Sequence, residues 1–280
     1  MEFFGLDEGA IRLSVFAGIF ATMALAETLF ARKTRTQKRT SRWFTNWALV
    51  VIDTAVLRII FPVLAVGVSV YAQQKGWGLF NVIALPTWLE IMIAIALLDM
   101  AVWAQHVATH KIPLLWRFHK VHHVDRDIDV TTGVRFHPVE IVLSMAYKLV
   151  LVLAIGPAAL AVFLFEVILN ASAMFNHSNV KLPNGMDRAL RAIMVTPDMH
   201  RVHHSIIMRE TDSNYGFFLS FWDRLFHTYI AQPEKGHDGM VIGLEEHQDD
   251  APSSLIWSLM LPFKDSAAAN EAVLAQEKTQ

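Results

Sequence analysis

The stretch 11–31, IRLSVFAGIFATMALAETLFA, carries charge only at Arg12 and Glu27. A helix of this length crosses about 30 Å of hydrocarbon, which is the thickness of a membrane core. The loop that follows, 32–42 (RKTRTQKRTSR), is strongly cationic. Because such loops stay on the cytoplasmic side, we expect this first helix to span a membrane and to end in the cytoplasm.

Three further apolar stretches follow: 44–71, bent near Pro62; 82–104; and a hairpin, 139–176, broken at Gly156. The hairpin either crosses the bilayer or dips into it and returns. Counting crossings from the cationic loop puts the ends of these segments near residues 104, 139 and 176 on the cytoplasmic side.

Composition supports this reading, since 54% of the 280 residues are hydrophobic and only 18% are charged, whereas soluble domains carry about a quarter charged residues. The sequence therefore predicts an all-α, polytopic helical membrane bundle with a cytosolic helical cap. We divide the chain into 1–84, with the first helices and the basic loop; 85–235, a core that includes the hairpin; and 236–280, a polar and interfacial tail. Within that tail, 255–263 is expected to be an amphipathic helix and 265–280 to be solvated.

Two features exclude whole classes of function. The formal net charge is −2 and no basic stripe is long enough for nucleic-acid binding, which argues against that function. The chain has no cysteine, so disulfides, thiolate metal sites, iron–sulfur clusters and cysteine nucleophiles are excluded.

The histidines form a repeated pattern. HxxHH occurs twice, HxxxH precedes the first copy, and one further histidine lies between the copies: His106, His110, His119, His122, His123, His177, His200, His203 and His204. On a helix, residues three and four apart share a face, so each cluster presents its imidazoles together. Nine histidines exceed the three or four that one zinc ion needs, which predicts two metal ions with open coordination positions.

The residues alone leave the metal open. Iron with open positions suits oxygen activation, whereas zinc on the same nitrogens acts only as a Lewis acid or activates water. Three isolated histidines, His227, His237 and His247, are interpreted as ordinary polar residues near the membrane boundary.

Three other polar residues have two readings each. His137, before Pro138, either caps a helix or serves as a further ligand or a partner of one. Asp99 and Asp198 either orient ligand histidines through the second ring nitrogen or are ordinary interfacial acids.

Beyond the histidine spacing, the surrounding text resembles the fatty acid hydroxylase/sterol desaturase superfamily of integral membrane di-iron oxygenases. The resemblance covers about residues 85–235 and is carried by HxxxH (106–110), WRFHxxHH (116–123), TGVRFHPVE (132–140), NHSN (176–179), TPDMHxxHHS (196–205), NYG (214–216) and WDRLF (222–226).

The resemblance implies that the nine histidines hold two iron ions and that O2 is the co-substrate. The implied reaction hydroxylates or desaturates a C–H bond of a lipid, such as a sterol or a fatty acyl chain. Some members have one more histidine where this chain has Ala173, and many have arginine where it has Val107.

No GxGxxG fingerprint, flavin motif or haem domain is found, so a separate ferredoxin or cytochrome with its reductase is the expected electron donor. We expect a bacterial-type inner membrane with the site on its cytoplasmic face. Two alternatives stay open: a zinc-dependent membrane hydrolase, and a non-enzymatic membrane protein that binds metal or haem.

Overall fold

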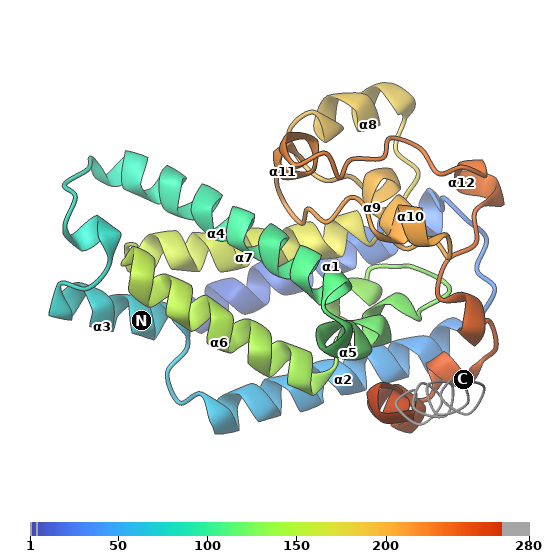
Figure 1. Ribbon diagram of the computed structural model, residues 1–280, viewed down its shortest axis with the longest axis horizontal. Coiled ribbons are helices and arrows are strands. Elements are labelled where there is room, and N and C mark those ends of the chain that lie inside the picture. The colour runs from blue at the N-terminus through green and yellow to red at the C-terminus, as the bar shows by residue number, and fades with distance from the viewer. Residues whose placement is uncertain (1, 4, 265–280) are drawn as a thin grey trace, which may run out of the picture.

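The computed structural model describes residues 2–3 and 5–264 and confirms the all-α class. Its long helices run side by side along the longest axis of the molecule (Figure 1) and are α1 Glu8–Leu29, α2 Arg39–Ile60, α4 Thr87–Lys111, α6 Pro138–Ile155 and α7 Ala159–Asn176. A short antiparallel hairpin, β1 Glu2–Phe3 with β2 Leu6–Asp7, precedes them. The predicted solvated tail 265–280 lies outside the described residues.

Five segments of the described chain are long and apolar enough to cross a membrane, judged by length and composition. The second of them, Arg39–Asn81, combines α2, α3 Ala65–Lys75 and the short helix η1 Leu79–Asn81. Large apolar side chains on these helices face outward, among them Leu13, Val51 and Ile59. An outer surface of this kind suits lipid rather than water, and the chain is a multi-pass membrane protein.

The predicted bend near Pro62 is a complete break. α2 ends at Ile60 and α3 begins at Ala65, because a proline ring clashes with the preceding turn and provides no N–H group. Irregular backbone at membrane depth is tolerated where it lines a cavity, and Pro62, Val63 and Leu64 do line one.

The tip of the α6–α7 hairpin is fixed by polar contacts. Gly156 ends α6 with φ 63°, the left-handed conformation that favours glycine. Asn81 donates to the Gly156 carbonyl (3.2 Å), Ser69 donates to the Pro157 carbonyl (2.6 Å), and Glu90 accepts the backbone N–H of Ala158 (2.7 Å). The turn therefore has a defined place between α3 and α4.

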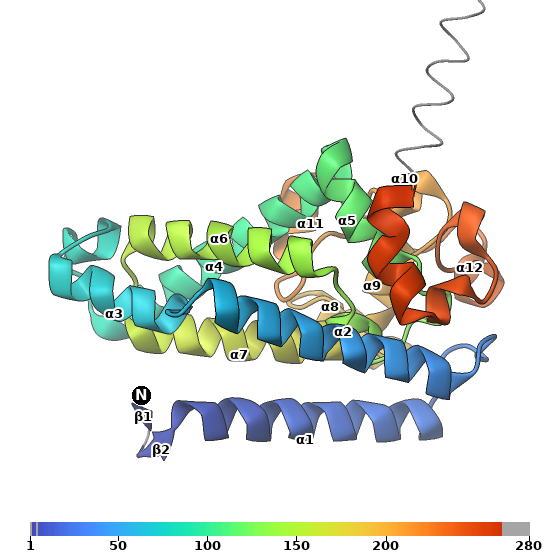
Figure 2. The ribbon, with the colours of Figure 1, turned by 90° about the horizontal axis from the view of Figure 1, so that it is seen from below.

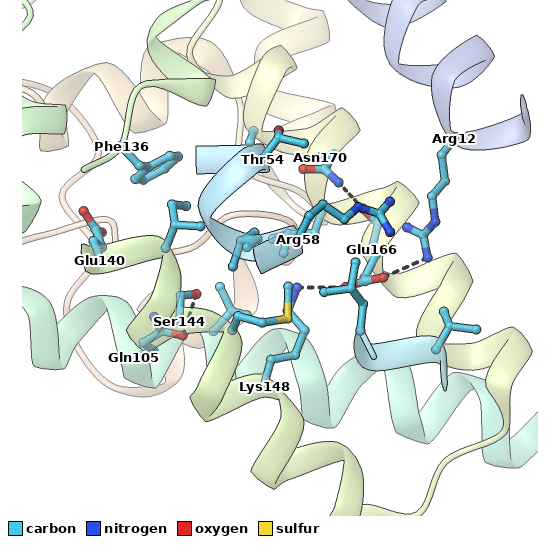
Figure 3. A pocket seen from close by; sticks show the side chains of 18 of the residues that line it. Arg12, Thr54, Arg58, Gln105, Phe136, Glu140, Ser144, Lys148, Glu166 and Asn170 are labelled. Atoms are coloured by element: carbon cyan, nitrogen blue, oxygen red, sulfur yellow. Dashed lines mark hydrogen bonds and ion pairs between the residues drawn. The ribbon is translucent and has the colours of Figure 1, made fainter. Parts of the chain in front are cut away.

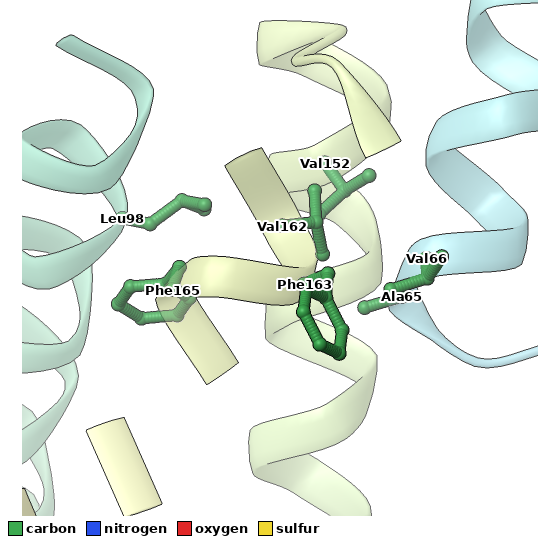
Figure 4. Packing of buried hydrophobic residues seen from close by; sticks show 7 residues of the cluster. All are labelled: Ala65, Val66, Leu98, Val152, Val162, Phe163 and Phe165. Atoms are coloured by element: carbon green, nitrogen blue, oxygen red, sulfur yellow. The ribbon is translucent and has the colours of Figure 1, made fainter. Parts of the chain in front are cut away.

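An apolar core joins four helices near this tip (Figure 4). It consists of Ala65 and Val66 from α3, Leu98 from α4, Val152 from α6, and Val162, Phe163 and Phe165 from α7. The cluster lies toward the end of the bundle that is remote from the histidines.

The other end carries the cap. Figure 2 shows that α1, α4 and α7 finish, and α2 and α6 begin, at the same end of the bundle, as the crossing count predicts. The cap elements are α5 Pro113–His123, η2 Thr132–Val134, α8 Asn184–Arg191, α9 Pro197–His203, α10 Met208–Thr211, α11 Phe221–Leu225, α12 Gly236–Gly239, η3 Glu245–His247 and η4 Ala251–Ser253.

The region assigned to an interfacial tail packs against this cap. The expected helix is present as Leu255–Lys264, and Leu261 is buried against Leu49, Val121 and Val124. Leu244 joins the same cluster. Segment 236–264 is thus part of the folded cap.

Candidate metal centre

Four elements bring the nine predicted histidines together. α4 carries His106 and His110 on its last two turns, α5 carries the first HxxHH cluster, and His177 is the C-cap of α7. The second HxxHH cluster lies on α9 and its C-cap; this helix starts at Pro197, and the Thr196 hydroxyl caps it. All of these elements meet at the cap end of the bundle (Figure 1).

The structure sorts these histidines into two groups. In each group one ring nitrogen per residue lies within 4.8 Å of every other; the first group is His106, His110, His119, His123 and His203, and the second is His122, His177, His200 and His204. The groups adjoin, because the ring centroids of His123 and His204 are 4.6 Å apart. Neither HxxHH cluster stays together, since each contributes to both groups.

Hydrogen bonds fix which nitrogen is free in the first group. His106 donates its Nδ1 proton to the Tyr215 carbonyl (2.7 Å), and His119 donates its Nδ1 proton to Glu140 Oε1 (2.6 Å). With those protons on Nδ1, the two Nε2 atoms both carry lone pairs, yet they lie 3.1 Å apart. Two acceptors at that distance repel each other unless a cation lies beside both.

The second group repeats this arrangement. His122 donates from Nδ1 to the Arg135 carbonyl (3.1 Å) and His177 to the Ala173 carbonyl (2.7 Å). Their Nε2 atoms are 3.0 Å apart, and His200 Nε2 lies 3.0 Å from that of His177. Ala173 thus supplies the carbonyl that orients His177.

These separations constrain the ion that fits. Two nitrogens each about 2.1 Å from one ion are about 3.0 Å apart at a right angle and about 3.4 Å apart at a tetrahedral angle. The observed 3.0–3.1 Å spacing matches right angles, which belong to five- and six-coordinate ions with room for further ligands. The donor set therefore fits two transition-metal ions, each held by several imidazoles.

Burial favours the neutral form of several of these imidazoles, which is the form that binds a metal. Desolvation lowers the pKa of His177 to about 4 and that of His203 to about 3, and it holds the pKa of His204 well below the ordinary value. Several ring nitrogens are buried without a hydrogen-bond partner among the described residues: His110 Nε2, both nitrogens of His123, His200 Nδ1, His203 Nε2 and both nitrogens of His204. Unpaired buried acceptors are costly, so a metal is the natural partner.

A buried ion-pair network ties the basic loop to the centre. Arg42 contacts Asp125 Oδ1 at 2.7 Å and Asp129 Oδ2 at 2.8 Å, and Asp127 accepts the backbone N–H of Thr36 (2.7 Å). Burial by itself would raise the pKa of Asp125, but Arg42 outweighs it and brings that pKa to about 2. The segment between the first cluster and η2 is held rigidly.

His137 takes the first of its two expected roles. Its Nδ1 accepts the backbone N–H of Val139 (3.2 Å) at the start of α6, and its Nε2 contacts the Leu259 carbonyl (3.2 Å). It belongs to neither group of ligands. His137 is therefore a helix cap that also holds the helix Leu255–Lys264.

Asp99 and Asp198, which could have oriented ligand histidines, have other polar partners. Asp99 accepts from Leu219 N and Trp222 Nε1. Asp198 pairs with Arg32 (3.2 Å). Sequence proximity placed them near histidines, but α4 and α9 turn their carboxylates toward other neighbours.

Glu140, the hydrogen-bond partner of His119, was not predicted from the sequence. Its only signal was the position of Glu140 in the first turn of the helix that begins at Pro138, beside the site. The other partners of ligand Nδ1 atoms are mostly backbone carbonyls, such as Ser213 O for His203 (2.7 Å), and no sequence pattern marks them. The isolated His227, His237 and His247 lie outside both groups, as expected.

A cavity of about 810 Å³ leads from the centre into the bundle. At the metal end it is lined by His106, His119, Gly133, Phe136 and Glu140. Apolar side chains line its middle: Val102, Ile141, Met145 and Leu169. It offers a hydrocarbon chain a path to the histidines from within the membrane-spanning region.

Comparison with known proteins points the same way. A family model described as fatty acid hydroxylase matches residues 91–228. Ornithine lipid hydroxylase OlsE of Rhizobium tropici is 29% identical over 227 residues, which cover 78% of this chain and 67% of that protein.

Two animal proteins are also similar. Alkylglycerol monooxygenase of Homo sapiens is 29% identical over 165 residues (57% of this chain, 35% of that protein), and cholesterol 25-hydroxylase of Mus musculus is 27% identical over 147 residues (51% and 48%). The chain thus spans about a third to a half of these two relatives. No solved structure gives a significant match.

Proposed function

Because the chain belongs to the fatty acid hydroxylase/sterol desaturase superfamily, we propose that it is a membrane-bound, O2-dependent di-iron oxidoreductase that hydroxylates or desaturates a lipid C–H bond. The observation that carries the proposal is the pair of adjoining imidazole groups whose Nε2 lone pairs face one another at 3.0–3.1 Å. The relatives act on membrane lipids or sterols by their names, which supports the same substrate class here.

The nine histidines would hold two iron ions, five imidazoles around one and four around the other. Iron so held supplies the activation of O2 that an unactivated C–H bond requires. The protein's own part is positional: carbonyl groups and Glu140 orient the rings, and Phe136 with the apolar cavity wall excludes water from the substrate.

The proposal includes a setting. Substrate reaches the centre from the bilayer through the cavity, and electrons come from a separate ferredoxin or cytochrome with its reductase. The cationic loop beside the centre favours a cytoplasmic face, and a bacterial inner membrane is the setting that we propose.

Metal content and lipid products test the proposal together. Protein purified without oxygen should hold iron near two per chain; zinc in its place would support the hydrolase alternative, and a Soret band would support haem binding. Lipids from aerated cells with and without the protein should differ by an oxygen atom or by two hydrogens. His122→Ala should abolish that difference and His247→Ala should keep it, whereas products that survive His122→Ala would refute the assignment.

A further inference from the structure

The cavity that His106 and His119 line at one end is also lined by charged side chains from the membrane-spanning helices, which Figure 3 shows. Among them are Arg12, Arg58, Lys148 and Glu166. Lys148 is the eleventh of the eighteen residues of α6, and Glu166 is the eighth of the eighteen of α7. Ionisable residues at such depth are costly and usually serve a function.

Two acidic residues from the start of α1, Asp7 and Glu8, also line the cavity, and Asp7 accepts the backbone N–H of Ala10. Arg12, Lys148 and Glu166 satisfy one another. Glu166 binds Arg12 through Oε2 (2.8 Å) and Lys148 through Oε1 (2.9 Å). Arg12 also pairs with Glu8 (2.9 Å). This network joins α1, α6 and α7, so the fold itself accounts for these residues.

Arg58 is not explained by ion pairing. Its guanidinium makes no hydrogen bond or ion pair with any residue in 2–3 or 5–264. In Figure 3 its side chain reaches across the cavity toward Asn170 and Glu166. Arg58 lies in the last turn of α2, where a cation favours the helix dipole, but that effect does not explain why the side chain lines the cavity.

We propose that Arg58 binds the anionic group, a phosphate or a carboxylate, of an amphiphile whose hydrocarbon chain fills the cavity as far as the histidines. A guanidinium suits both groups because its paired N–H donors match two oxygens. This inference rests on the proposed function and specifies its substrate class.

The same geometry sets where the chain is oxidised. Arg58 lines the cavity together with Asn170 and Glu166 and is drawn reaching toward them in Figure 3. These two residues precede His177 by seven and eleven residues of α7. At 1.5 Å per residue the anionic group lies between about 10 and 16 Å from the centre. The reacting carbon should lie that far along the chain from the anionic group.

Binding of simple probes tests the proposal. The iron-loaded 280-residue protein, in nanodiscs of uncharged lipid and kept free of oxygen, is titrated with decyl phosphate, decanol, decyltrimethylammonium and inorganic phosphate. Decyl phosphate should bind most tightly. Arg58→Gln should weaken it about tenfold or more, because a charge-assisted hydrogen bond is lost, and Arg58→Lys should weaken it less.

Lys75→Gln is the matched control, because Lys75 is also a cation in the last turn of a helix but lies outside the cavity. It should leave the affinity for decyl phosphate unchanged. Equal binding of decanol, stronger binding of the ammonium probe, or no effect of Arg58→Gln would overturn the proposal. If inorganic phosphate bound as tightly as decyl phosphate, the proposal of an amphiphilic ligand would be wrong, and Arg58 would belong to a site for a free anion.

The readout separates this inference from the proposed function. Binding is measured without oxygen, so a protein that fails to oxidise lipid in air can still bind decyl phosphate through Arg58. Conversely, if Arg58→Gln oxidised lipid normally and bound decyl phosphate as tightly as the wild type, the proposed role of Arg58 would be wrong. The proposed oxygenase function would be unaffected.

Discussion

Gly133→Ala should damage the second histidine group although it replaces none of the predicted ligands. Gly133 lies in η2, against the end of α7. A Cβ added there would lie 2.6 Å from the Ala173 carbonyl oxygen and 3.3 Å from His177 Nδ1. That oxygen is the one that accepts the His177 Nδ1 proton at 2.7 Å. The substitution therefore pushes on the group that sets the ring of a predicted ligand.

The size of the effect follows from the clash. Side-chain Cβ atoms essentially never come within 3.0 Å of another atom, so Gly133 or the carbonyl must move by about 0.4 Å. Overpacking of this kind costs about 1–3 kcal/mol. If the strain is relieved by moving His177, it appears as a loss of metal affinity of about five- to 150-fold.

The assay is metal content under competition with a chelator, measured on protein purified without oxygen, together with thermal unfolding of the metal-free protein. Gly185→Ala is the control, since a Cβ there meets nothing within 4 Å. We expect Gly133→Ala to lose one ion more readily than the other. Retention of both ions at wild-type affinity, or the same loss in Gly185→Ala, would refute the reasoning.

Three further predictions concern other parts of the fold. Glu140→Gln should lower affinity for one metal ion about 10- to 100-fold, measured by chelator competition, because the charged partner of His119 is lost. Arg42→Ala should destabilise the protein by about 3–5 kcal/mol in denaturant unfolding, because it leaves the buried Asp125 carboxylate unpaired. Gly156→Ala should lower the unfolding temperature, since φ is 63° and a Cβ would lie 2.3 Å from the Trp77 carbonyl.

Each of these has a matched control in the chain. Glu245→Gln and Arg188→Ala change exposed residues far from such contacts, and both should behave as wild type. Gly76→Ala shares the positive φ of Gly156 (67°) but a Cβ there meets nothing, so it should cost less than Gly156→Ala. A control as damaging as its partner would contradict the corresponding argument.

Local rules were enough to predict the framework. Apolar run lengths gave the spanning segments, and the cationic loop gave the parity that puts all three histidine clusters at one end. Spacing by three and four placed His106 with His110 on one face of α4. The length of a spanning segment, the face of a helix and the side on which each helix ends depend only on one helix or on the order of helices. All three can therefore be predicted from the sequence.

Tertiary packing decided what local rules left open. The sequence could not show that His122 joins His177 rather than His119, because neighbouring residues on α5 point to different sides of the centre. One of the two readings of Asp198 was that it orients a ligand histidine, but its carboxylate pairs with Arg32, which lies far away along the chain. Contacts between residues that are far apart in the sequence produce no local spacing pattern, so they could not be predicted.

The two halves of the centre are electrostatically unequal, and this follows from which groups touch the ligands. In the first group, His119 donates to the carboxylate of Glu140, and His110 Nδ1 lies 3.5 Å from Asp212 Oδ1. In the second, His122 and His177 donate to backbone carbonyls. A carboxylate behind an imidazole makes that ring a stronger donor than a carbonyl does. The first group would therefore donate more strongly to a bound ion than the second, and two of its histidines, His106 and His119, line the cavity together with Glu140, where substrate would arrive.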